Sequence, residues 1–209
     1  MTILTLIGRA TSINVRKVLW TCRELDLPCR LDEGPADPAR RDALLALNPA
    51  GQYPVLLDDR LAAPLTQSNA ICRYLATRQG RDDLLPVAPG ARAVVEQWMD
   101  WQATDLNGAW RYAFMALVRR APGFGHAADV AASVAAWNAA MVLLDRRLAQ
   151  TGAHVAGAAF TLADIVLGLS VNRWRLSPIA RPALPAVEDY WRRLGSRPGF
   201  ADHVDNGVP

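Results

Sequence analysis

The chain has 209 residues, 51% of them hydrophobic, and a formal net charge of +3, which is typical of a soluble globular protein with one large or two small domains. The longest stretch without charged residues, 148–163, is interrupted by Gln150, His154 and two glycines, so it is not a membrane span. The basic residues are scattered arginine pairs without an aromatic stripe between them, and nucleic-acid binding is therefore not expected.

The beginning of the chain and its cysteines favour a cytoplasmic protein. The sequence starts directly with an apolar run and shows neither the basic region nor the small-residue cleavage site of a signal peptide. The three cysteines form no CxxC pair and stand in apolar surroundings, which indicates reduced structural thiols.

Up to about residue 80, short apolar runs alternate with helical patterns. Apolar residues at helical spacing from Val15 to Leu25, for example, follow a strand-like run at 2–7. Strands and helices in this alternation predict a mixed sheet with helices on its faces. The predicted order is strand 2–7, a helix ending near residue 26, strand 29–32, helix 38–47, strands 55–58 and 61–63, and helix 68–78.

The rest of the chain shows only helical patterns. A segment rich in Pro and Gly near residues 80–90 reads as a linker. All phenylalanines and every tryptophan except Trp20 lie after it, so the second part must build a core of its own. We predict an α/β domain at 1–80, a linker at 81–88 and an all-helical domain at 89–209.

One helix start in the second part has a specific signature. Thr161 can cap a helix, Asp164 three residues later can return a bond to the cap, and Phe160 can pack onto Ile165. We interpret Asp164 as a structural capping residue and not as a catalytic acid, because its charge suits the helix N-terminus.

Four motifs together carry a family resemblance. GRATSINVRKVLW at 8–20, GQYPVLLDD at 51–59, TQSNAICRYLA at 66–76 and FTLADIVLG at 160–168, in this order and spacing, resemble the cytosolic glutathione S-transferase family. The resemblance covers essentially the whole chain and implies a thioredoxin-like N-terminal domain, βαβαββα, with an all-α domain behind it. It also implies glutathione as co-substrate without a metal, a second-substrate site in the helical domain, a homodimer, and a role in detoxification.

The resemblance places the thiolate site at Ser12, with Asn14 as the rival. A serine hydroxyl between the first strand and the first helix could donate to a sulfur anion, and the helix N-terminus would favour the same charge. Some bacterial and fungal family members use an asparagine two residues further on. A tyrosine-type site is excluded because Tyr53 is the first tyrosine of the chain. A purely structural reading, with Ser12 as a helix cap, stays open.

The remaining glutathione contacts are also carried over from the family. The resemblance implies a cis bond between Tyr53 and Pro54 whose flanking backbone binds the cysteinyl part, with Gln52 beside it. Gln67 and Ser68 at the next helix start suit the γ-glutamyl carboxylate. Gln67 stands where many members have Glu, so Asp100 or Asp105 is a candidate partner for the ammonium. Arg40 or its neighbour Arg41 is a candidate for the glycyl carboxylate.

The second substrate is expected between Ser12 and the long helix, with Trp110, Tyr112 and Phe114 as its wall. No histidine pair has metal spacing, and Ser12-Ile13-Asn14-Val15 replaces the CxxC that internal dithiol exchange would need. The predicted function is conjugation of glutathione to a small, hydrophobic electrophile. A glutathione-dependent disulfide reductase and a non-catalytic binding protein with the same fold remain alternatives.

Overall fold

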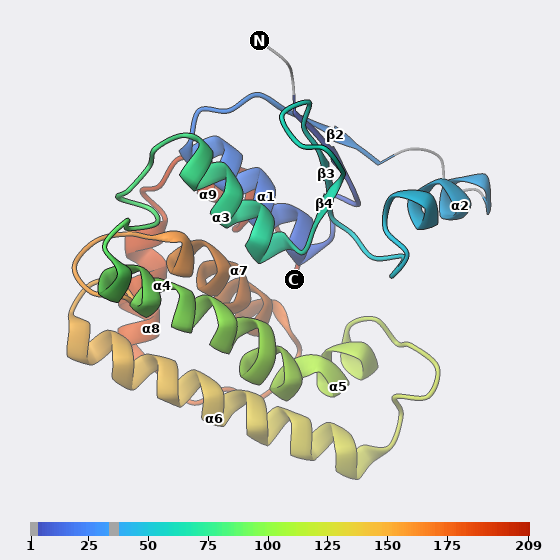
Figure 1. Cartoon of the computed structure of the whole chain (residues 1–209). Coiled ribbons are helices and arrows are strands. Elements are labelled where there is room, and N and C mark those ends of the chain that lie inside the picture. The colour runs from blue at the N-terminus through green and yellow to red at the C-terminus, as the bar shows by residue number, and fades with distance from the viewer. Residues whose placement is uncertain (1–3, 34–37) are drawn as a thin grey trace.

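A computed structural model describes residues 4–33 and 38–209, with the side chains of residues 38–40 outside the described part. Its first part is an α/β domain around a four-stranded sheet in the order β2-β1-β3-β4 (Figure 1). β2 is parallel to β1, whereas β3 is antiparallel to both β1 and β4. The elements are β1 Leu4–Ile7, α1 Ile13–Glu24, β2 Cys29–Asp32, α2 Pro38–Leu47, β3 Val55–Leu57, β4 Leu65–Thr66 and α3 Ser68–Arg78.

The helices cover the sheet on both sides. α1 and α3 lie side by side on one face, and α2 lies on the other (Figure 1). The apolar stripe of α1 is fully buried at Val15 and Val18, as its helical spacing predicts, and Ile71 and Leu75 of α3 are buried against the same core. The predicted βαβαββα order and the mixed sheet are confirmed.

One predicted strand was wrong. The hairpin partner of β3 is not 61–63 but β4, in which Thr66 pairs with Val55 and Leu65 with Leu56. Ala62 and Ala63 are exposed, and Pro64 after them has no N–H to donate to a ladder. The apolar residues at 61–63 therefore belong to the loop after β3, and the antiparallel pairing begins only beyond the proline.

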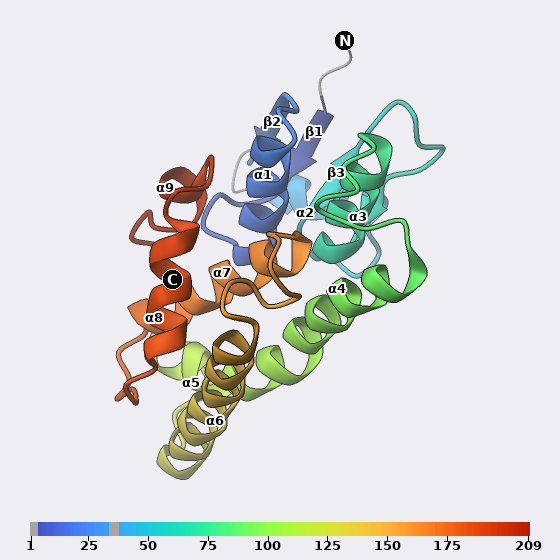
Figure 2. The same ribbon diagram turned by 90° about the vertical axis from the view of Figure 1, so that its left-hand side faces the viewer.

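The second part is helical throughout and packs beneath the sheet domain (Figure 2). The predicted long helix beginning near residue 94 is continuous but contains one wider turn, η1, in the middle, between α4 and α5. Residues 79–88, between α3 and α4, form turns only. The elements are α4 Pro89–Trp101, η1 Gln102–Leu106, α5 Asn107–Leu117, α6 Ala127–Thr151, α7 Leu162–Leu176, α8 Pro185–Leu194 and α9 Phe200–His203.

The two parts share one tight interface, where α1 contacts α7. Trp20 is fully buried there between Phe160 and Phe200, at centroid distances of 5.9 and 6.0 Å. Gly168 lets the helices approach, because a Cβ at this position would lie 3.1 Å from Cζ3 of Trp20 and 2.8 Å from Cδ1 of Leu194. The single tryptophan of the first part thus belongs to the core that joins it to the second.

The start of α7 has the predicted capping box. The backbone N–H and hydroxyl of Thr161 donate to Oδ2 of Asp164 at 2.8 and 3.1 Å. The backbone N–H of Val155 and the hydroxyl of Tyr190 donate to Oδ1, both at 3.0 Å. Asp164 is fully buried, so four donors hold a carboxylate that has no access to solvent or substrate.

Among the described helices, α6 is long and apolar enough to cross a membrane by length and composition alone. This is weak evidence, since core helices of soluble proteins pass the same test. α6 contacts α5 along one side and α8 along another, as an element of the helical domain.

Candidate functional site

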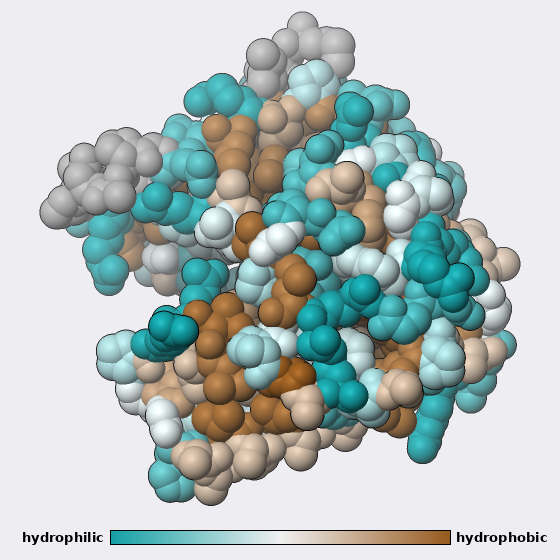
Figure 3. Space-filling model, turned by 180° about the vertical axis from the view of Figure 1, so that it is seen from behind, coloured by the Kyte–Doolittle hydropathy of each residue, from teal (hydrophilic) through white to brown (hydrophobic). Residues whose placement is uncertain are grey.

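A cleft of about 600 Å³ opens between the N-terminal end of α1 and the η1–α5 segment. Figure 3 shows the molecule hollowed between its two parts, with hydrophilic and apolar side chains meeting there. Its lining combines polar groups from the first part with aromatic and basic groups from the second. The lining residues are Ser12, Ile13, Asn14, Gln52, Ala103, Thr104, Asn107, Gly108, Trp110, Arg111, Phe114, Met115, Arg119 and Arg173.

Ser12 occupies the N-cap position of α1, but its hydroxyl does not cap the helix. Its backbone is fully used, since the N–H donates to the carbonyl of Arg9 at 2.9 Å and the carbonyl accepts from Arg16 at 3.0 Å. Among the described residues, the hydroxyl has no hydrogen-bond partner. A half-buried hydroxyl in the cleft is therefore free to donate to a ligand, and the purely structural reading of Ser12 lacks its capping bond.

The turn from β1 into α1 depends on Gly8. A Cβ at this position would lie 2.4 Å from Cγ2 of Val15, which is closer than side chains tolerate. The first turn of α1 contains no acidic residue, so its free N–H groups meet no competing negative charge from their own helix. This end of α1 thus favours an anion near Ser12.

Asn14 is held by the start of α3. The Ser68 hydroxyl donates to Oδ1 of Asn14 at 3.3 Å, which brings two helix N-termini together. The Asn14 amide nitrogen has no acceptor among the described residues, and Asn14 lines the cleft. Gln67, directly before α3, has φ +69°, a conformation that costs energy for a residue with a side chain and that often marks functional sites.

The loop before β3 supplies the third side of the site. The Tyr53-Pro54 bond is cis, as the resemblance implied, and Pro54 is buried while Gln52 lines the cleft. The Asn48 amide donates to the carbonyl of Gln52 at 2.8 Å and fixes the loop. The predicted contact at Arg40 falls on a side chain outside the described residues.

Two of the three predicted wall residues line the cleft. Trp110 and Phe114 stack edge to face at 5.4 Å, one turn apart on α5. Tyr112 is not among the lining residues, because its ring packs on Phe124 at 5.2 Å on another side of α5. Helical geometry explains the difference, since residues four apart share a face and residues two apart do not.

The two carboxylates predicted as candidate partners for the γ-glutamyl ammonium of glutathione are already paired within the protein. The Asp100 carboxylate pairs with Arg73 at 2.6 Å, and the Asp105 carboxylate accepts the hydroxyl of Thr104 at 2.7 Å. Neither residue lines the cleft.

A buried polar cluster lies at the η1 turn. Lys17, only 1% exposed, donates to Oε1 of Gln102 at 2.7 Å and to Oδ1 of Asn69 at 3.4 Å. Gln102 in turn donates to Oδ1 of Asn107, which lines the cleft. Burial lowers the pKa of Lys17 to about 7. The cluster joins α1, α3 and η1, and a wider helical turn of this kind is frequent at functional sites.

Sequence reasoning missed Arg173. It belongs to α7, all of whose first thirteen residues are buried, and it is itself 3% exposed. Its guanidinium lies 4.4 Å from the ring centroid of Trp110 and 4.0 Å from that of Phe114. The sequence signal that could have found it is an arginine at the end of an apolar run in a core helix, because arginine is seldom fully buried without a partner.

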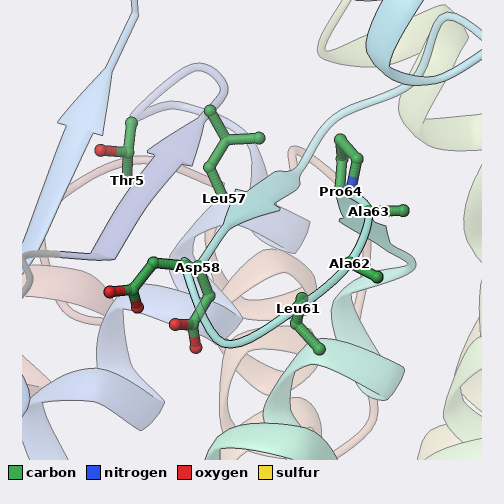
Figure 4. A pocket seen from close by; sticks show the side chains of 8 residues that line it. Thr5, Leu57, Asp58, Leu61, Ala62, Ala63 and Pro64 are labelled. Carbon is green, nitrogen blue, oxygen red and sulfur yellow. The ribbon is translucent and has the colours of Figure 1, made fainter.

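A second cavity of about 390 Å³ lies at the other end of the strands, around the loop after β3 (Figure 4). Ser12 does not take part in it; the lining residues are Thr5, Leu57, Asp58, Asp59, Leu61, Ala62, Ala63 and Pro64. Within the described ranges, no group of three His, Cys, Asp or Glu residues could hold a metal ion.

Comparisons with known proteins point to one family. A family model described as the glutathione S-transferase N-terminal domain matches residues 6–83. Glutathione S-transferase GstB of Escherichia coli K12 is 36% identical over 197 residues, covering 93% of this chain and 94% of that protein. Glutathione S-transferase 3 of Zea mays is 34% identical over 216 residues, which cover 96% of this chain and 93% of that protein.

A solved structure also matches the chain over nearly its full length. The theta class glutathione S-transferase of Xanthomonas axonopodis pv. citri, with glutathione bound, superposes with a TM-score of 0.87 at 36% identity and 98% coverage of both chains. Because sequence and structure match over nearly their full length, the chain belongs to the glutathione S-transferase family of enzymes.

Proposed function

We propose that this protein binds glutathione in the cleft, stabilises its thiolate with Ser12 and Asn14, and conjugates it to a small electrophile. The observation that carries the proposal is the Ser12 hydroxyl, which lies in the cleft at the N-terminus of α1 without a partner among the described residues. Asn14, with its unpaired amide, is the second donor.

The required stabilisation is modest. A free thiol of this kind has a pKa of roughly 8.5 to 9, so only a few per cent is thiolate at neutral pH. Lowering that pKa by about two units corresponds to about 2.7 kcal/mol of preferential thiolate binding. One or two hydrogen bonds and a helix N-terminus supply energies of this size.

The rest of the tripeptide fits the flanking groups. Ser68 and Gln67 at the start of α3 suit the γ-glutamyl carboxylate, and the backbone at Tyr53 and the side chain of Gln52 suit the cysteinyl part. In the reaction, the thiol proton passes to solvent, the sulfur forms a bond to the electrophilic carbon, and the leaving group departs with the bonding electrons. The protein acts by positioning and by stabilising the anion.

Conjugation of glutathione to 1-chloro-2,4-dinitrobenzene tests the proposal. We expect activity in the wild type and a loss of about 100-fold in kcat for Ser12→Ala. Ser196→Ala is the matched control, because its hydroxyl is exposed and donates to the carbonyl of Arg193 far from the cleft. A small effect of Ser12→Ala with a large one of Asn14→Ala would move the main role to Asn14.

Two other outcomes would change the assigned activity. Glutathione binding without conjugation, but with reduction of a mixed disulfide, would favour a glutathione-dependent reductase. No glutathione binding at all would contradict the enzyme and favour an interaction protein with this fold. We also propose that the protein is a homodimer in the cytoplasm, as family membership implies. Light scattering on the purified protein tests the homodimer, and fractionation of the cells that produce it tests the location.

A further inference from the structure

Within the part of the chain that the structure describes, Arg173 is a buried cation without a hydrogen-bonding partner. The residue is 3% exposed, and its Nε is buried without an acceptor. Its guanidinium lies over the rings of Trp110 and Phe114, and among the described residues it donates no hydrogen bond. The two rings stabilise the cation through their faces, but they leave all its N–H donors unpaired.

The described surroundings of Arg173 add further positive charge. Arg111 and Arg119 line the same cleft, and the Arg119 guanidinium lies 5.6 Å from the Phe114 centroid. None of the described lining residues is acidic. Burial, with Arg16 and Arg119 nearby, lowers the pKa of Arg173 to about 9, so the group is still charged at neutral pH.

Arg16 cannot neutralise Arg173, because it carries the same positive charge and lies close enough to lower the pKa of Arg173. Its own guanidinium donates to the carbonyl of Val208 at 2.8 Å, to the backbone oxygen of Pro209 at 3.0 Å and to Oδ1 of Asn206 at 3.2 Å. Leaving such a charge buried and unpaired is costly unless an opposite charge completes the site.

We infer that the second substrate is an anion, a small aromatic electrophile whose carboxylate binds Arg173 and Arg119 while its ring packs against Trp110 and Met115, the half-buried apolar residues of the cleft lining. A guanidinium fork binds a carboxylate through two parallel hydrogen bonds. Trp110 and Met115 of α5 give the cleft an apolar part, and Ser12 at the start of α1 lines the same cleft. This inference rests on the proposed function, because it names the substrate class of that site.

A matched pair of substrates tests the charge directly. 4-Chloro-3,5-dinitrobenzoate and 4-chloro-3,5-dinitrobenzamide have nearly the same shape and react with glutathione in the same way. The sulfur bonds to the ring carbon, chloride leaves with the electron pair, and the thiol proton passes to solvent. Each kcat/KM is divided by the uncatalysed rate constant, so that the difference in intrinsic reactivity cancels.

We expect the wild type to prefer the benzoate by about 10- to 100-fold, the range of a hydrogen-bonded charge pair. Arg173→Gln should abolish the preference by raising KM for the benzoate, with KM for glutathione unchanged. Arg175→Gln is the matched control. Arg175 also lies on α7 and over a tryptophan, 4.8 Å from the Trp191 centroid, but it pairs with Glu188 and does not line the cleft.

A second variant and a binding assay test the anion site even if Arg173→Gln does not fold. If Arg173→Gln melts below the assay temperature, Arg119→Gln, whose side chain is exposed, should lower the preference by about 3- to 10-fold. Quenching of tryptophan fluorescence by unreactive 3,5-dinitrobenzoate, against the corresponding amide, measures anion binding without catalysis.

The outcomes separate the two proposals. Equal normalised kcat/KM for acid and amide in an active wild type would overturn the anionic substrate and leave the transferase intact. A rise in KM for glutathione alone in Arg173→Gln would assign the arginine to the tripeptide and also overturn it. Selective binding of 3,5-dinitrobenzoate that depends on Arg173, without any conjugation, would support the anion site and contradict the transferase.

Discussion

The Ser68 hydroxyl lies 3.3 Å from Oδ1 of Asn14 and joins the start of α3 to the first turn of α1. Because Oδ1 accepts this bond, the amide nitrogen of Asn14 is left to face the cleft as a donor. The contact therefore connects the residues proposed for the γ-glutamyl carboxylate with those proposed for the thiolate. A change at either residue should be felt at both ends of the bound tripeptide.

A double-mutant cycle measures this connection. Ser68→Ala should lower kcat/KM for glutathione about tenfold, because the single hydroxyl proton of Ser68 is donated to Oδ1 of Asn14 and the variant releases that side chain. Ser68→Ala combined with Asn14→Ala should lose less than the product of the two single losses, because both remove the same contact. Strictly multiplicative effects on kcat/KM would show that the two residues act independently.

Lys17 gives the protein a specific pH dependence of stability. Burial lowers its pKa from 10.5 to about 7, so between these values the unfolded chain binds a proton that the folded chain does not. Stability from this group therefore rises with pH across about 7 to 10.5. Lys17→Met should lack this rise, and the difference in urea-unfolding free energy between wild type and variant should grow in favour of the wild type as pH increases.

Asp58 should contribute to stability at neutral pH and lose this contribution in acid. Burial alone would raise its pKa, but the Tyr74 hydroxyl, the Arg60 N–H and the Arg78 guanidinium outweigh it and lower the pKa below 3.8. The side chain is 1% exposed and pairs with Arg78 at 2.7 Å. We expect Asp58→Asn to cost about 2 kcal/mol at pH 7. The cost should shrink as pH falls through the native pKa, where the wild type loses the same charge; a pH-independent cost would contradict this assignment.

Asp164 should matter for stability and not for the chemistry. Its buried carboxylate accepts from Thr161, Val155 and Tyr190, so Asp164→Ala would leave several buried donors unpaired. We expect a loss of about 3 kcal/mol or more in the free energy of unfolding. The folded fraction should retain wild-type kcat per active site, measured below the transition temperature. A fall in kcat of folded protein would instead point to a role at the cleft.

Much of the fold was predictable because the signals are local. Helical spacing identified α1, α3 and the long helices, and Thr161 with Asp164 identified the start of α7, since each depends on residues within one or two turns. The strand predicted at 61–63 was wrong because a short apolar run does not reveal its pairing partner. Pro64 shifted the ladder to β4, and only the register with Val55 and Leu56 shows this.

The sequence by itself determined which residues could serve a glutathione site. Ser12, Asn14 and the Gln67-Ser68 pair were identifiable from helix-start chemistry and the family motifs. The tertiary structure decided how they are arranged: Ser12 makes no capping bond, Ser68 donates to Asn14, and Tyr112 does not line the cleft that Trp110 and Phe114 line. It alone revealed Arg173 between the two rings. The physical reason is that a helix start depends on neighbours in the chain, whereas an unpaired buried charge becomes visible only when α5 and α7 are packed together.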